Sequence, residues 1–104
     1  MTDERPTELP ADVELIRTTD LFSHDTVPAG LLGIHRVARG TWGRIVVASG
    51  ELVFHFVESA EEAHPPPPIT LRAGQTLVIP PEHPHRVELV GPTNFKVEFH
   101  SSVN

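Results

Sequence analysis

Cysteine and tyrosine are both absent from this sequence of 104 residues. Without cysteine the chain can form neither a disulfide framework nor a thiolate metal site, so any bound metal must be held by imidazole and carboxylate groups. Covalent catalysis has few candidate nucleophiles, because the serines lie in predicted turns or near the C-terminus and none occurs in a nucleophile-elbow sequence. Histidine is therefore the residue type on which the chemistry of a site would depend.

Positive charge is also scarce. Eight Lys and Arg residues face 14 Asp and Glu residues, which gives a net charge of −6 with the seven histidines neutral. Phosphate binding needs clustered Lys and Arg, so a nucleic-acid partner is disfavoured. No apolar run approaches membrane-spanning length, and the first twenty residues do not resemble a signal peptide. We therefore expect a cytoplasmic protein with no membrane partner.

Eleven prolines and seven glycines punctuate short apolar runs along the chain. This pattern favours an all-β fold with frequent turns, and no window shows helical periodicity. We predict one β domain over residues 12–104, a sandwich or jelly-roll barrel, after a mobile acidic arm over residues 1–11. Ser49-Gly50 is predicted to be a hairpin turn, and the polyproline run Pro65–Pro68 a stiff connector. The expected strands cover residues 13–17, 31–38, 44–48, 51–57, 69–72, 76–79, 85–90 and 95–100.

Two stretches, His35–Gly50 and Gly74–His85, each place a histidine on an apolar strand. His35 lies two residues before Val37, and His85 lies two residues before Val87. Each histidine therefore shares a strand face with a residue that belongs in the core. We predict that both imidazoles point into one cavity of the barrel. Val37 and Val87 should line this cavity, and Trp42, which follows a glycine-threonine turn, is expected to cap its mouth.

A neutral imidazole offers one lone pair to a metal, so the pair predicts a site for one divalent transition metal, Zn, Fe, Ni or Cu. Two protein ligands make a weak site, and His83 or Glu98 is the candidate third ligand. His83 lies in a proline loop, and Glu98 alternates with the apolar residues of its strand, which would send it outward. The alternative is a pocket without metal, in which the two histidines hydrogen-bond each other or the main chain.

The two glycine-to-histidine stretches resemble the signature motifs of the cupin superfamily. In the second stretch Gly74, Pro80 and His85 have the motif spacing, with Glu82 where glycine is usual. In the first, only His35 matches, because Val37 stands at the second histidine position. The segments VPAGLLGIH, GTWGRIVVASGELVF and IPPEHPHRVEL further resemble a small cupin family, found as the N-terminal domain of some tellurite-resistance protein B sequences and as stand-alone bacterial proteins. The resemblance implies an all-β cupin-type jelly-roll β-barrel (double-stranded β-helix) in a single domain.

Three functions stay open. The first is a small-molecule or metal-binding cupin that senses or sequesters a ligand, with a link to tellurite, oxyanion or stress response that the resemblance alone implies. The second is a metal-dependent enzyme of the dioxygenase or isomerase type acting at His35 and His85, for which imidazole could also supply acid–base chemistry. The third is a regulatory or interaction module without metal. We also predict a homodimer, because Val53, His55 and Val57 give a partly apolar outer strand face.

Overall fold

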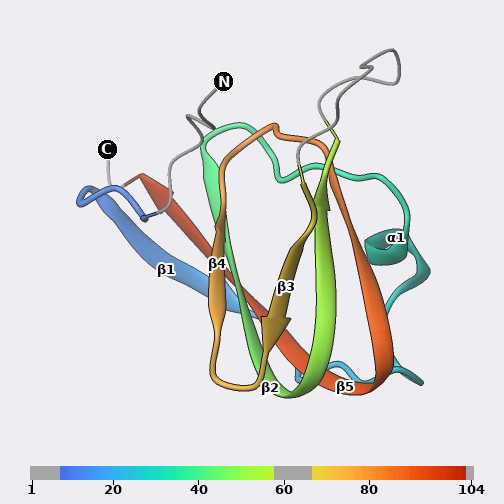
Figure 1. Cartoon of the computed structure of the whole chain (residues 1–104). Coiled ribbons are helices and arrows are strands. Elements are labelled where there is room, and N and C mark those ends of the chain that lie inside the picture. The colour runs from blue at the N-terminus through green and yellow to red at the C-terminus, as the bar shows by residue number, and fades with distance from the viewer. Residues whose placement is uncertain (1–7, 58–66, 103–104) are drawn as a thin grey trace.

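Two long antiparallel strands, β2 (Thr41–Phe56) and β5 (His85–Ser102), pair along most of their length and form the frame of the domain in this computed structural model (Figure 1). The structure describes residues 8–57 and 67–102. Three short strands complete the antiparallel sheet: β1 (Val13–Thr18) beside β5, and β3 (Ile69–Arg72) and β4 (Thr76–Ile79) beside β2. One short helix, α1 (Ala29–Leu32), flanks the sheet. The described chain is thus almost entirely β, as predicted.

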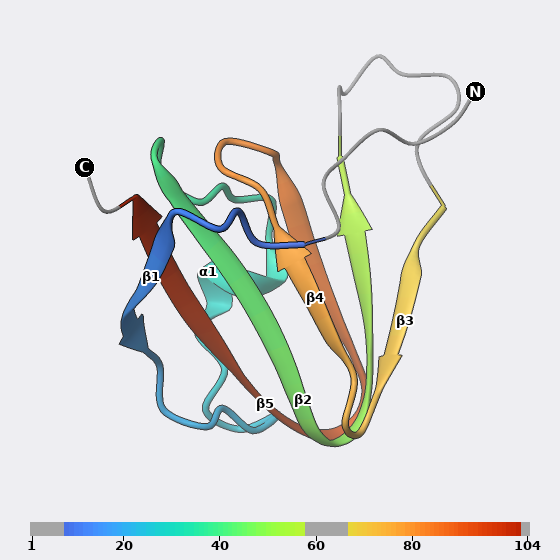
Figure 2. The ribbon, with the colours of Figure 1, turned by 90° about the vertical axis from the view of Figure 1, so that its left-hand side faces the viewer.

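β2 and β5 bend together near their midpoints and divide the sheet into two legs (Figure 2). The first leg contains the first half of β2 and the second half of β5, extended by β1 and β4. The second leg contains the other halves of β2 and β5, extended by β3. The register between β2 and β5 shifts at Ser49 and again before Glu51, which places the bend at Gly50.

The bend is fixed by close packing at Gly50 and Thr93. Gly50 has a φ of 80°, and a Cβ there would overlap the Pro92 carbonyl oxygen and lie 2.8 Å from the Thr93 Cα. The Thr93 side chain is fully buried, and its hydroxyl donates a hydrogen bond of 2.8 Å to the Glu51 carbonyl oxygen. Only glycine combines this left-handed backbone with such a close approach. The two legs therefore meet at a defined angle.

The core lies between the two legs. Buried residues alternate with more exposed ones along β2, so one face of each leg is apolar and turned toward the other leg. This sheet does not close into a full barrel: in the part of the chain that the structure describes, β1 and β3 lie at its two ends. The buried apolar residues are Val37, Ile45, Val47, Leu52, Phe54, Phe56, Leu71, Val78, Ile79, Val87, Phe95 and Val97.

One expected turn and one expected strand differ from the structure. Ser49-Gly50 was predicted to join a hairpin, but the arms on either side of it pair with β5 and not with each other. Residues 31–38 form no strand: the segment holds the end of α1 and then a single β-bridge at His35. The strands at 85–90 and 95–100 are the two halves of β5. Residues 13–17, 69–72 and 76–79 are strands as expected.

The N-terminal seven residues of the expected acidic arm and most of the proline-rich loop, residues 58–66, lie outside the described residues. In the described ranges, no helix has the length and apolar character needed to cross a membrane.

Candidate functional site

His35 and His85 lie side by side although fifty residues separate them in the sequence. Their main chains form an isolated antiparallel bridge, in which each N–H donates to the other residue's carbonyl oxygen at 2.9 Å. The imidazole rings meet edge to face, with their centroids 4.2 Å apart. The bridge fixes both Cα positions, so the rings are held together by the backbone and not by a flexible side-chain contact.

The same local hydrogen bond orients each ring. Nδ1 of His35 lies 2.8 Å from the Gly33 carbonyl oxygen, and Nδ1 of His85 lies 2.8 Å from the His83 carbonyl oxygen. A carbonyl oxygen only accepts hydrogen bonds, so Nδ1 carries the proton in each ring. In a neutral ring Nε2 then carries the lone pair. The pair therefore has two nitrogens that can accept a hydrogen bond or bind a metal ion.

His85 is the deeper member of the pair. Its side chain is 2% exposed and stacks on Phe54, with ring centroids 5.1 Å apart. Burial is the main reason that the pKa of His85 falls from 6.5 to about 4; the neighbouring His35 and His83 add to the lowering, and the hydrogen bond to the His83 carbonyl partly opposes it. His85 is therefore neutral at physiological pH.

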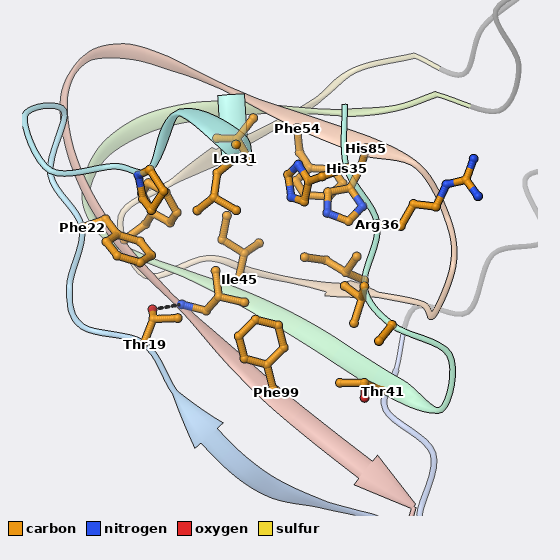
Figure 3. A pocket seen from close by; sticks show the side chains of 18 of the residues that line it. Thr19, Phe22, Leu31, His35, Arg36, Thr41, Ile45, Phe54, His85 and Phe99 are labelled. Carbon is orange, nitrogen blue, oxygen red and sulfur yellow. Dashed lines mark hydrogen bonds between the residues drawn. The ribbon is translucent and has the colours of Figure 1, made fainter. Parts of the chain in front are cut away.

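Both histidines line a cavity of about 490 Å³ between the legs (Figure 3). Its walls are mainly aliphatic and aromatic, and in Figure 3 Phe99 lies well away from the two imidazoles. Arg17 and Arg36 also border the cavity, but both are exposed. The apolar lining comprises Phe22, Pro28, Gly30, Leu31, Val37, Ala38, Ile45, Phe54, Ile79, Val87, Phe95, Val97 and Phe99. This is a mainly apolar space with a polar pair in its wall.

The other residues expected at the pocket divide into two groups. Val37 and Val87 line the cavity. Trp42 is not among its lining residues, because Gly43 and Ile45 are buried toward the core and strand alternation sends Trp42 to the opposite face. A Trp42 cap over the mouth is therefore not what the structure shows.

The two candidate third ligands differ in position. The His83 ring packs edge to face on Phe56, with centroids 6.4 Å apart, and its carbonyl orients His85. Glu98 lies on the outer face of β5, where its carboxylate is 3.1 Å from Arg44 Nε and 3.2 Å from His100 Nε2. The structure therefore does not bring Glu98 to the pair. Within the described ranges, no three His, Cys, Asp or Glu side chains are placed to share a metal ion.

Sequence reasoning missed the aromatic wall of the cavity. The alternation along residues 95–99 predicts one apolar strand face made of Phe95, Val97 and Phe99, and all three line the cavity. Phe22 joins them because its main chain forms an isolated bridge with Phe95, and the two rings meet edge to face at 5.7 Å. No local signal near Phe22 indicates a partner seventy-three positions away.

Comparison with solved structures supports the fold. A crystal structure of a protein from Escherichia coli strain K12 superposes with a TM-score of 0.84 at 27% identity, covering 93% of this chain and 98% of that one. TehB from Haemophilus influenzae gives a TM-score of 0.78 at 19% identity, over 88% of this chain and 32% of TehB. A cupin-2 domain protein from Shewanella frigidimarina gives 0.51 at 18% identity, over 88% and 72%. The last two show the fold alone, which is cupin-like.

Sequence comparison gives the family. The protein YeaR of Escherichia coli strain K12 is 28% identical over 96 residues, which cover 88% of this chain and 81% of YeaR; YeaR of strain O157:H7 matches equally. The TehB-like domain matches residues 17–97, a range that contains both halves of the histidine pair. The resemblance noted in the sequence is thereby confirmed, and the chain belongs to the TehB-like domain family.

Proposed function

We propose that this TehB-like domain binds a small molecule in the cavity between its legs, with His35 and His85 as the polar contacts. The observation that carries the proposal is the paired histidines in the wall of a mainly apolar space of about 490 Å³. Ligand sites are commonly cavities of roughly 300–1,000 Å³ with apolar walls and a few placed polar groups. The cavity has this size, and its walls are mainly apolar with a few polar side chains.

The histidine pair is also preorganised. The main-chain bridge fixes the two residues relative to each other, and each Nδ1 is already hydrogen-bonded to a carbonyl oxygen. A ligand would therefore not have to order the rings on binding, which lowers the entropic cost of association.

Titration of isotope-labelled, tag-free protein with a library of small aromatic and aliphatic compounds tests the proposal. We expect a subset to shift the NMR signals of His35, His85 and Phe95 together. The variant Phe95→Trp, which fills the cavity, should abolish these shifts, and the control Val90→Trp on an exposed site should keep them. Shifts confined to the outer face, or absent throughout the library, would remove the proposal.

A second candidate is one divalent transition metal held by Nε2 of His35 and Nε2 of His85. The observation that favours it is the Nδ1 hydrogen bond of each ring, because metal-bound histidines usually donate their other N–H to such an acceptor. Two protein ligands suit a weak, open site. A bound ion would act as a Lewis acid toward a ligand oxygen, and the hypothesis of a metal-dependent enzyme depends on this same site.

Metal analysis after reconstitution with Zn²⁺ or Ni²⁺ tests this candidate. We expect the double variant His35→Ala, His85→Ala to lose the metal, while Glu98→Ala, on the outer face, retains it. His83→Ala decides whether a third ligand contributes. Wild-type protein that takes up no metal would end the metal hypothesis and leave the small-molecule proposal in place.

The family resemblance suggests an alternative ligand, an oxyanion such as tellurite or another stress-related compound, and growth of a deletion strain on tellurite tests that alternative. The homodimer predicted through Val53, His55 and Val57 is tested by sedimentation, since a monomer at every protein concentration would exclude it. In the structure His55 lies 3.0 Å from Glu88 on this outer face.

A further inference from the structure

The polar atoms that His35 and His85 can offer to the cavity are acceptors. Each Nδ1–H is used by a main-chain carbonyl, so Nε2, with its lone pair, is the nitrogen available to a ligand. A ligand that brings only hydrogen-bond acceptors to the histidine pair would face two lone pairs. Its own polar atoms would stay unpaired, which is costly in an apolar space.

Among the other polar side chains that line the cavity, Thr41 lies well away from the two imidazoles (Figure 3), and Thr19, Arg17 and Arg36 do not change this balance. The Thr19 hydroxyl is already used twice, as it accepts from the Val97 N–H and donates to the Asp20 carbonyl oxygen, both at 2.9 Å. The Arg17 guanidinium lies over the Phe99 ring, 5.0 Å from its centroid, and Arg36 extends away from the histidine pair (Figure 3). Both arginines are exposed, so they stay hydrated and do not neutralise an anion held at the imidazoles.

A fully deprotonated oxyanion brings only acceptors, so it would fit at the histidine pair only if an imidazole became protonated. An oxyanion that keeps an O–H would still place its charge in a mainly apolar cavity, which is costly. His85 is 2% exposed and packed on Phe54, so a charge there would be poorly solvated. An uncharged donor meets no such penalty, because its O–H or N–H satisfies a lone pair and its apolar part contacts the walls.

We propose that the ligand of this cavity is an uncharged molecule with an apolar body and an O–H or N–H group, such as a phenol or an alcohol, and not an oxyanion. The donor group donates its hydrogen to Nε2 of His35 or of His85, and the apolar body lies against the aromatic wall around Phe95. This inference rests on the proposed function, since it names the chemical class that the same cavity selects.

Three probes of similar shape test the proposal: 4-propylphenol, its methyl ether 4-propylanisole, and 4-propylbenzoate. Dissociation constants are measured by NMR titration of tag-free protein near neutral pH. We expect the phenol to bind about tenfold more tightly than the ether, since one buried hydrogen bond is gained and an acceptor is satisfied, and the benzoate to bind most weakly. The His85 Nε2 resonance should shift with the phenol and not with the ether.

His85→Phe keeps an aromatic ring on Phe54 and removes one of the two acceptors, so the ratio of phenol to ether affinity should fall, and combining it with His35→Phe should bring the ratio close to one. His35→Phe gives the same test if the first variant does not fold, and His55→Phe, on the outer face, is the matched control that keeps the ratio. Equal binding of phenol and ether by the wild type, or tightest binding of the benzoate, would overturn the ligand class alone. Failure of all three probes to shift cavity signals would count against the proposed function itself.

Discussion

The main-chain N–H of His35 donates to the carbonyl oxygen of His85, and the N–H of His85 donates to that of His35, each at 2.9 Å. This bridge connects the segment after α1 to the first residue of β5. It brings the two rings to a centroid distance of 4.2 Å at the wall of the cavity. The position of the site thus depends on backbone hydrogen bonding between distant segments, while its chemistry depends on the tautomer that each local carbonyl selects.

The first prediction concerns pH. The pKa of His85 is lowered to about 4 in the folded protein, whereas an unfolded histidine titrates near 6.5. Below about pH 6.5 the unfolded chain binds a proton that the native state excludes, so the stability contributed by neutral His85 is complete above that pH and is lost as the pH falls toward about 4. The loss should reach up to about 3 kcal/mol.

Urea unfolding at a series of pH values measures this effect. His85→Phe should flatten the decline between about pH 6.5 and about pH 4, whereas His24→Gln, at an exposed site, should follow the wild-type curve. If the wild type and His85→Phe lose stability in parallel over this range, the desolvation of His85 is not the cause.

How much of this site the sequence predicts depends on the range of each interaction. His35 with Val37 and His85 with Val87 carry a period-two pattern, and this local signal was enough to predict that both histidines line one cavity, although residues 31–38 form no strand. Trp42 was misplaced although a local signal existed: Ile45 and Val47 alternate on the core side of β2, which leaves residue 42 on the other side. Counting back along the strand would have corrected it.

The long strands could not be predicted locally. Ser49-Gly50 has the composition of a hairpin turn, and the same two residues serve equally well in a bend. The choice is made by β5, which pairs with both halves of β2 across sequence separations from 29 positions (Phe56 with His85) to 60 positions (Thr41 with Ser101). The positive φ of Gly50 was thus foreseeable, whereas the pairing partner of its neighbours was not.

A second prediction concerns Phe54, which is fully buried and stacks on His85. Phe54→Ala removes the ring and leaves a void beside the histidine pair, so the free energy of unfolding should fall by about 3–5 kcal/mol. The exposed Ile34→Ala should change it by less than about 0.5 kcal/mol. Chemical denaturation of both variants checks the prediction, and a loss below about 1 kcal/mol at Phe54 would mean that the ring is not part of a close-packed core.

A third prediction concerns Glu82, which has a φ of 64°, a left-handed conformation that disfavours residues with a Cβ. Its side chain is exposed, and its main-chain N–H donates to the Val37 carbonyl oxygen at 2.9 Å. Glu82→Gly should stabilise the protein by about 0.5–1 kcal/mol, because the strain relieved exceeds the entropy that glycine adds to the unfolded chain.

The matched control is Glu14→Gly in the edge strand β1, where φ is negative and the same substitution should destabilise by about 0.5–1 kcal/mol. Opposite signs at the two positions, measured by thermal or urea unfolding, support the account. A loss of stability at Glu82 equal to that at Glu14 would show that the backbone there carries no strain.

The final prediction separates the cost of backbone strain from the cost of steric overlap at Gly50. Gly40 and Gly50 have nearly equal φ values, 81° and 80°, but a Cβ at Gly40 would meet nothing within 4 Å, whereas one at Gly50 would overlap the Pro92 carbonyl oxygen. Gly40→Ala should therefore cost only the left-handed strain, about 1–2 kcal/mol, and Gly50→Ala that strain plus the steric displacement, about 2–5 kcal/mol in total. Urea unfolding measures both. Pro92 belongs to β5, the strand that bends together with β2, so Gly50→Ala should also change the angle between the legs and weaken binding in the cavity. Gly40→Ala should leave binding unchanged. Equal effects of the two variants would mean that the close approach at Gly50 does not set the bend.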